Sequence, residues 1–141
     1  MARLHESAVG LRIMGDDLAP DEISRQLGCL PTFAQLKGEA IVGERSGQTR
    51  VAKCGMWRLR AQPREPEDLN GQIAEILGQL SDDLDVWKAI SDRYSVDLFC
   101  GLLMDGSNEG LSVSASSLFA LGARGIQLSL DLYGPGSSAS A

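Results

Sequence analysis

LNGQIAEILGQLSDDLDVWKAISDRY, residues 69–94, is the longest run with helical periodicity in the sequence. Its apolar residues return every three or four positions, which is the spacing of one face of an α-helix. The pattern pauses at residues 81–83, where Ser81 is a suitable N-cap and the aspartates favour the positive end of a new helix. We therefore predict two consecutive helices here, with a strand–helix–strand pattern on each side of them.

Upstream of this stretch, the sequence predicts strands around one short helix. Residues 8–14 alternate between apolar and mixed side chains, as in a half-buried strand. A helix is predicted at residues 20–27, because it begins with a proline and is followed by a glycine. Residues 32–37 form a second candidate strand. Residues 38–50 are rich in glycine and charge, which predicts a long mobile loop with a short strand at residues 40–42.

Residues 51–60 form a further candidate strand with two chemically different faces. Trp57 and Leu59 fall on one face and should point into the core. Arg58 and Arg60 fall on the other face and should point out of the sheet. This strand therefore predicts a sheet with one buried face and one charged face.

Downstream of the helix pair, a second strand–helix–strand pattern follows. Residues 96–104 are apolar on both faces, which is typical of a central strand or of one that faces a partner. A short strand is predicted at residues 111–113. A helix should begin at residue 114 or 115 and end at Leu121. Residues 126–133 alternate strictly and predict a strand.

These patterns predict an α+β fold, with a mostly antiparallel sheet of four to six strands and helices packed on one face. We expect one domain over residues 8–133, a flexible N-terminus at residues 1–7 and a disordered tail at residues 134–141. The residues expected in the core are Leu11, Ile13, Ile23, Leu27, Trp57, Leu59, Ile73, Leu77, Leu80, Trp87, Leu98, Leu118, Leu128 and Leu130.

Composition and charge exclude several classes of protein. The net charge of -6 opposes sequence-independent nucleic-acid binding, which needs a strong basic field. Basic residues nevertheless exceed acidic ones, nine to seven, within residues 1–60. No apolar run approaches the roughly 20 residues that span a bilayer, so no membrane partner is expected. The N-terminus lacks the apolar segment of a secretory signal, which favours a cytoplasmic protein.

Few residues are available for metal or nucleophile chemistry. Cys29, Cys54 and Cys100 are widely separated and have no metal-ligand spacing. His5 is the only histidine, so a zinc site using imidazole or a His-dependent nucleophile would have to rest on it. We expect no metal, no cofactor and no catalytic residues, and a non-enzymatic role is favoured over an enzymatic one.

Several short motifs together resemble one known family. They are Gly15–Ile23 with Leu27–Gly28 and Pro31–Thr32, then Lys37–Gly38 and Gly55–Trp57, and finally Leu121–Gly122 with Leu128–Tyr133. The chain resembles, over about Ala8 to Tyr133, a bacterial family known as domain of unknown function four-two-seven-nine. The resemblance implies a free-standing α+β domain of cytosolic bacterial proteins, and it brings no activity or catalytic residue. The chain departs from the family pattern at Ala19, where a polar helix cap would be usual.

A group of cations is the sharpest candidate for a ligand site. Guanidinium and ammonium groups can gather around a phosphate or a carboxylate. The alternative is a solvated loop that binds nothing, because charge runs usually lie on a solvated face. The candidate ligand-binding residues are Lys37, Arg45, Arg50, Lys53, Arg58 and Arg60.

Acidic residues form a weaker candidate site. Asp16, Asp17 and Asp105 could supply oxygen ligands to a divalent cation if their strands end at the same edge of the sheet. Turn residues that bond their own backbone are the ordinary account of them. Asp131 should project from the exposed sheet face, where acid–base chemistry would need a close partner.

The sheet face opposite the helices is the candidate partner surface. Met14, Phe99, Leu103 and Tyr133 should lie there and mix apolar with polar chemistry, as protein interfaces do. Our first hypothesis is a non-enzymatic interaction domain that uses this helix-free face for a homodimer or for another protein. The alternative is a binder of, or an enzyme acting on, a small anionic ligand held by the cations above.

Overall fold

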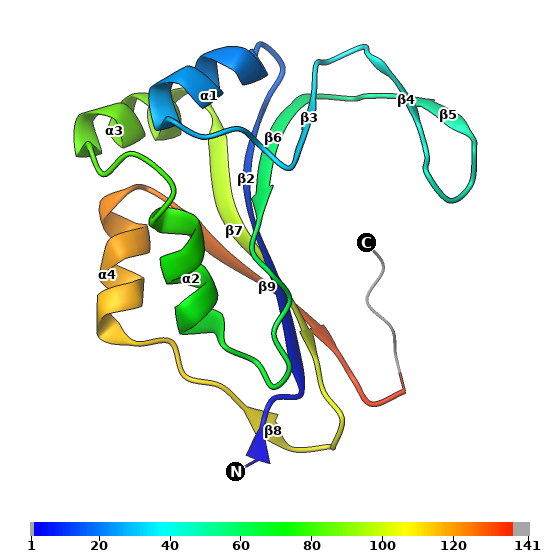
Figure 1. The fold of residues 1–141 in the computed structure, drawn as a ribbon, viewed down its shortest axis with the longest axis vertical. Helices are drawn as coiled ribbons and strands as arrows, with labels where there is room; N and C mark the ends of the chain where they lie inside the picture. Colours follow the sequence, from blue (N-terminus) through cyan, green and yellow to red (C-terminus); the bar gives the residue numbers. More distant parts are fainter. Residues whose placement is uncertain (1, 137–141) are drawn as a thin grey trace.

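The computed structural model describes residues 2–136 as one sheet covered by helices, with two small strand pairs beside it (Figure 1). In chain order, the elements are β1 (Ala2–Arg3), β2 (Glu6–Gly15), α1 (Pro20–Leu27), β3 (Phe33–Gln35), β4 (Ala40–Val42), β5 (Thr49–Val51), β6 (Gly55–Arg60), α2 (Leu69–Leu77), α3 (Leu84–Arg93), β7 (Ser95–Leu103), β8 (Glu109–Gly110), α4 (Ala115–Ala123) and β9 (Gln127–Tyr133).

The main sheet has the strand order β3-β6-β2-β7-β9, which confirms the α+β class and a strand count within the predicted range. It is mixed, whereas the sequence predicts a mostly antiparallel sheet. The pairs β3–β6, β6–β2 and β2–β7 are antiparallel, but β7 and β9 are parallel. The reason is α4, which crosses over between β7 and β9 and returns the chain to the start of β7.

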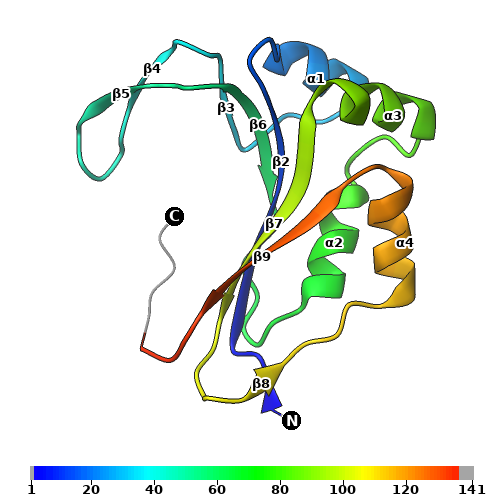
Figure 2. The ribbon, with the colours of Figure 1, turned by 180° about the vertical axis from the view of Figure 1, so that it is seen from behind.

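The four helices lie on one face of this sheet, as predicted, and leave the other face without a helix (Figures 1 and 2). The hairpin of β4 and β5 pairs only with itself and projects away from the helix layer. The helix-free face is therefore open among the described residues, and it is the face on which the site below is built.

Local signals explain where the helices begin and end. Pro20 opens α1 and Gly28 ends it with a φ of 74°, a left-handed conformation that glycine adopts without strain. The side chain of Asp83, rather than that of Ser81, caps α3 by accepting from the backbone N–H of Asp85. Ser81 instead accepts from the backbone N–H of Asp83 at 3.2 Å, so it shapes the turn that precedes the cap.

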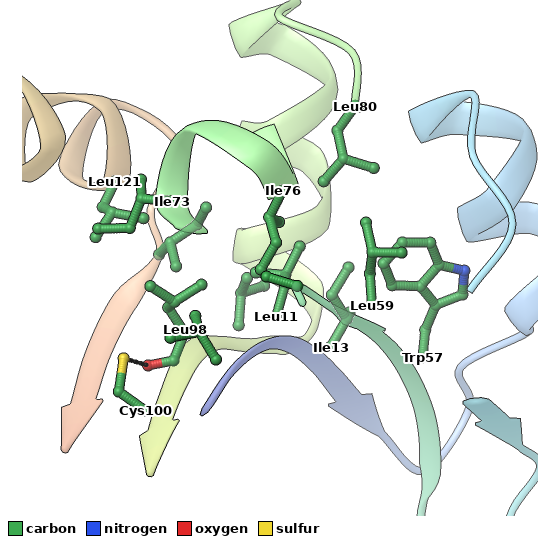
Figure 3. Packing of buried hydrophobic residues seen from close by; sticks show 14 of the residues in the cluster. Leu11, Ile13, Trp57, Leu59, Ile73, Ile76, Leu80, Leu98, Cys100 and Leu121 are labelled. Atoms are coloured by element: carbon green, nitrogen blue, oxygen red, sulfur yellow. Dashed lines mark hydrogen bonds between the residues drawn. The ribbon is translucent and has the colours of Figure 1, made fainter. Parts of the chain in front are cut away.

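The core lies between the sheet and the helices (Figure 3). Both tryptophans are fully buried there, and each indole N–H has a partner. Trp57 donates to Ser24 Oγ at 3.0 Å, and Trp87 donates to the carbonyl of Ser81 at 2.7 Å. Of the residues expected in the core, those that are buried are Leu11, Ile13, Ile23, Leu27, Trp57, Leu59, Ile73, Leu80, Trp87 and Leu98.

Two of the expected core residues are exposed, and two are only partly buried. Leu118 is 50% exposed and Leu130 is 49% exposed. Leu118 lies outside the buried stripe of α4, and Leu130 lies on the edge strand beyond the cover of the helices. Leu77 and Leu128 are half-buried and pack against the core.

The N-terminal segment and the loop before α4 also differ from the predicted pattern. Within residues 1–7, predicted to be flexible, the structure has β1, the start of β2 and a buried Leu4. The strand predicted at residues 111–113 is absent, and the short strand lies at β8 instead. Of the predicted tail, residues 137–141 lie outside the described residues. Within residues 2–136, no helix is long and apolar enough to cross a membrane.

Candidate functional site

The helix-free face carries a hollow of about 710 Å³ over β6, β2, β7 and β9. Its floor is formed by small residues, Ala8, Gly10 and Gly101. A Cβ added at Gly10 would lie 3.4 Å from Arg60 Cγ, so a side chain there would press against that arginine. The small floor residues therefore leave room between larger side chains on the outer strands.

The β6 side of the hollow is cationic. The antiparallel register pairs Arg12 with Arg58 and Gly10 with Arg60, so three arginines gather on the same face. The guanidinium of Arg58 lies over the ring of Phe33, 4.8 Å from its centroid. Burial, followed by the charges of Arg60 and Arg12, lowers the pKa of Arg58 below its ordinary value.

Arg58 also has a buried hydrogen-bond donor without an acceptor among the described residues. This donor is its Nε. Neither Arg58 nor Arg60 has an ion pair within residues 2–136. A buried donor without a partner is costly, so this environment penalises Arg58.

Arg12 differs from these two arginines because Asp97 neutralises it. Its Nε donates to Asp97 Oδ1 at 2.9 Å and its Nη2 donates to Oδ2 at 2.6 Å, a bidentate pair. The hydrogen bond with Asp97 raises the pKa of Arg12. Ser129 Oγ also donates to Asp97, and the Arg12 guanidinium covers the ring of Phe99 at 4.4 Å. Arg12 is thus held in a fixed position at the side of the hollow.

The β9 side of the hollow is acidic. Asp131 and Tyr133 line it, and the Tyr133 hydroxyl donates to Asp131 Oδ2 at 2.7 Å. The two sides thus carry opposite charge. The arrangement can hold an anionic group near Arg58 and Arg60, and Asp131 can accept a hydrogen bond from the far end of the same molecule.

The structure brings only two of the six sequence-predicted cations to this hollow. Arg58 and Arg60 line it, whereas Lys37, Arg45, Arg50 and Lys53 do not. The last four lie on or beside the β4–β5 hairpin. Lys37 pairs with Asp16 at 3.1 Å, and Arg50 donates to Gln35 Oε1 at 3.4 Å.

The four residues of the predicted partner surface all lie half-buried on the helix-free face. Phe99 and Tyr133 line the hollow, while Met14 and Leu103 do not. Much of the ring of Phe99 faces Arg12 rather than solvent. The large apolar residues that are exposed, such as Phe119, Leu130 and Leu132, lie outside this hollow.

The acidic candidates separate in the structure. Asp17 pairs with Arg93 at 2.7 Å. It follows β2, and Asp105 follows β7; because these strands are antiparallel, the two turns lie at opposite ends of the sheet. Within the described part of the chain, no group of three or more His, Cys, Asp or Glu side chains is placed to hold a metal ion. All three cysteines are free thiols, and burial raises the pKa of Cys100 to about 12, which leaves it protonated and unreactive.

Sequence reasoning did not include Arg12 and Asp97 among the site residues. The sequence does carry a signal for Arg12. It lies between the core residues Leu11 and Ile13, so its side chain points away from the core, as the side chain of Arg58 does. If β2 and β6 pair, the two arginines therefore lie on the same face of the sheet. The pairing with Asp97 depends on the β2–β7 register, which places Arg12 opposite Asp97. No local pattern reveals that register.

Comparisons with known proteins add no activity. No curated protein and no solved structure matches the chain. One family matches it over residues 5–135, nearly its whole length. The chain therefore belongs to the family described as domain of unknown function DUF4279.

Proposed function

We propose that this protein binds a small anionic ligand in the hollow of its helix-free face, with Arg58 and Arg60 as the residues that contact the anion. The observation that carries the proposal is that Arg58 and Arg60 line the hollow together and neither has an ion pair within residues 2–136. A carboxylate or phosphate oxygen placed there would accept from Arg58 and offset its charge. Arginine suits this role because its planar fork matches both groups.

Electrostatics support an anion in preference to a neutral ligand. The lowered pKa of Arg58 reflects burial together with repulsion from Arg60 and Arg12. A bound negative charge would offset the repulsion from Arg60 and Arg12 and would stabilise the charged form of Arg58. Asp97 already neutralises Arg12, which leaves Arg58 and Arg60 as the cations free to act.

The size and lining of the hollow support a small molecule with two different ends. A volume of about 710 Å³ lies within the usual range for small-molecule sites. Asp131 on the opposite side would repel a second negative group and accept from a hydroxyl or an amine. The described lining contains no cysteine, histidine or lysine, which favours binding over catalysis.

The test is thermal unfolding of the purified protein with phosphate, pyrophosphate, citrate and simple carboxylates, against sodium chloride of equal ionic strength. A ligand at about one hundred times its Kd stabilises the native state by about 2.7 kcal/mol, which is a measurable shift. Arg58→Gln and Arg60→Gln should each lose most of that shift. The matched control is Arg45→Gln, which removes the same charge from an exposed hairpin residue.

Two results would contradict the proposal. One is that no anion stabilises the wild-type protein beyond the chloride control. The other is that Arg45→Gln weakens the effect as much as Arg58→Gln, because the anion would then respond to overall charge and not to the hollow.

A protein partner on the same face is the second candidate. It is supported by Phe99 and Tyr133, two aromatic residues of the kind that anchor interfaces, beside unneutralised arginines. Such a partner would insert an acidic side chain between Arg58 and Arg60. A glutamate-rich peptide should then stabilise the wild type while free carboxylates do not, and a lysine-rich peptide of equal length should have no effect.

A further inference from the structure

The outer edge of β9 is a long strand edge to which no other strand in residues 2–136 is paired. β9 is the last strand of the sheet and pairs with β7 along its whole length. The strand at the opposite edge, β3, has only 3 residues. Exposed edges are usually protected by lysine, proline or a bulge. Residues 127–133 contain neither residue, and their register with β7 has no bulge.

Three residues of β9 direct their backbone N–H and C=O groups outward, to this edge. The N–H of Met104 donates to the carbonyl of Tyr133 at 2.9 Å, so the backbone groups of Tyr133 point toward β7. Alternate residues of a strand direct these groups to opposite sides. The N–H and C=O groups of Leu128, Leu130 and Leu132 therefore point outward, away from β7.

The side chains of the same three leucines lie on the helix side of the sheet, where Leu128 packs against the core but Leu130 and Leu132 are poorly covered. Leu130 is 49% exposed and Leu132 is 62% exposed. Figure 2 shows the reason, because β9 runs past the helices and its second half extends beyond them. The edge thus combines free backbone groups with an apolar stripe.

We propose that two copies of this chain pair through β9, antiparallel and about a two-fold axis at Leu130. In this register Leu130 meets its own counterpart, and Leu128 meets Leu132 of the partner subunit. The one charged residue of the strand, Asp131, lies opposite Ser129 of the partner subunit and not opposite another carboxylate. The strand is therefore complementary to itself in both apolar pattern and charge.

The backbone directions fit the same register. Leu128, Leu130 and Leu132 would all occupy hydrogen-bonded positions, and each such pair exchanges two bonds, about six in all. The axis is perpendicular to the sheet, so both helix layers lie on the same side and the leucines of the two copies meet there. The two hollows lie on the other side and stay open, so this inference does not depend on the ligand proposed above.

The test is sedimentation velocity of the full chain over a concentration series up to roughly 1 mM, the weak end of specific association. We expect a reversible monomer–dimer equilibrium. Leu130→Lys should raise its Kd at least tenfold, because two ammonium groups would face each other at the axis. The matched control is Leu36→Lys, at a leucine that is 50% exposed beside the opposite edge of the sheet, and it should leave the Kd unchanged.

Amide hydrogen exchange identifies the edge directly. Within β9, the N–H groups of Leu128, Leu130 and Leu132 should exchange more slowly as protein concentration rises. Thermal unfolding of each variant shows whether it has folded. A monomer at every concentration, a dimer insensitive to Leu130→Lys, or exchange at these three amides that is independent of concentration would each overturn the proposal.

Discussion

Replacing Asp97 with asparagine should act in opposite directions on stability and on anion binding. Asp97 holds Arg12 by two hydrogen bonds and accepts a third from Ser129. Its side chain is 8% exposed and that of Arg12 is 27% exposed, so the pair is largely shielded from water. Asp97→Asn removes the charge, leaves Arg12 without its counter-ion and disrupts the bond from Ser129.

The cost to stability follows from these contacts. Hydrogen bonds to charged groups contribute about 1.5–3 kcal/mol, and removing one partner of a fully buried ion pair costs about 3–5 kcal/mol. Because Arg12 keeps some contact with water, we expect about 2–3 kcal/mol. With a urea m-value of about 1–3 kcal/mol per molar, the unfolding midpoint should fall by about 0.7–3 M. Asp92→Asn is the control, because its pair with Lys88 is solvent-exposed and contributes little to stability.

The gain in anion binding has a separate origin. Without Asp97, the charge of Arg12 is no longer neutralised and adds to those of Arg58 and Arg60. In a hollow open to water, one added unit charge contributes about 1 kcal/mol or less. The Kd of the stabilising anion should therefore fall by up to about sixfold, measured by titration calorimetry. An unchanged urea midpoint, or a weaker affinity for the anion, would refute the reasoning.

Three further substitutions test single contacts. Gly101→Val should abolish anion stabilisation, because the larger side chain fills the hollow. The protein should stay folded, because a Cβ added at Gly101 meets only ordinary contacts, the nearest at 3.7 Å. Thermal unfolding with and without the anion measures both effects. Ser24→Ala should cost about 1–2 kcal/mol in urea unfolding, because the indole N–H of buried Trp57 loses its acceptor, and an unchanged midpoint would argue against that bond. Glu75→Gln should destabilise the protein at neutral pH but progressively less in acid. The hydrogen bond from Arg64 lowers the pKa of Glu75 below its ordinary 4.5. The contribution of the Glu75 carboxylate to stability is therefore present above pH 4.5 and is lost as the pH falls through the lower folded-state pKa. A difference between wild type and Glu75→Gln that stays constant from pH 6 to acid unfolding would contradict that account.

Helix and strand positions could be predicted where a local signal marks their ends. The first helix has the predicted bounds because Pro20 and Gly28 restrict the backbone whatever surrounds them. The alternation of residues 126–133 likewise predicts β9 to within a residue. Such signals act through one or two neighbouring residues, so no tertiary information is needed to interpret them.

Burial on the outer strand could not be predicted in the same way. Leu128 and Leu130 belong to one alternating pattern, yet the first packs against the core and the second is about half exposed. The difference depends on how far the helix layer extends over the sheet, which no pattern within β9 records. The parallel pairing of β7 and β9 was accessible, because a strand–helix–strand sequence favours it.

The candidate site was only partly accessible from sequence. Arg58 and Arg60 were identified as charges on the outer face, and the structure places both at the hollow. The hairpin cations are close to them in sequence but separated from the hollow in space, since β4 and β5 pair only with each other. Proximity along the chain therefore overstated the size of the cationic cluster.

The most direct test of the central claim is a titration of the isotope-labelled protein with the stabilising anion, or with phosphate, followed by backbone amide chemical shifts. The account predicts the largest and saturable changes at Gly10, Arg58 and Arg60, with little change in the hairpin at residues 40–51. Changes confined to the hairpin, or no saturable change at the hollow, would contradict it.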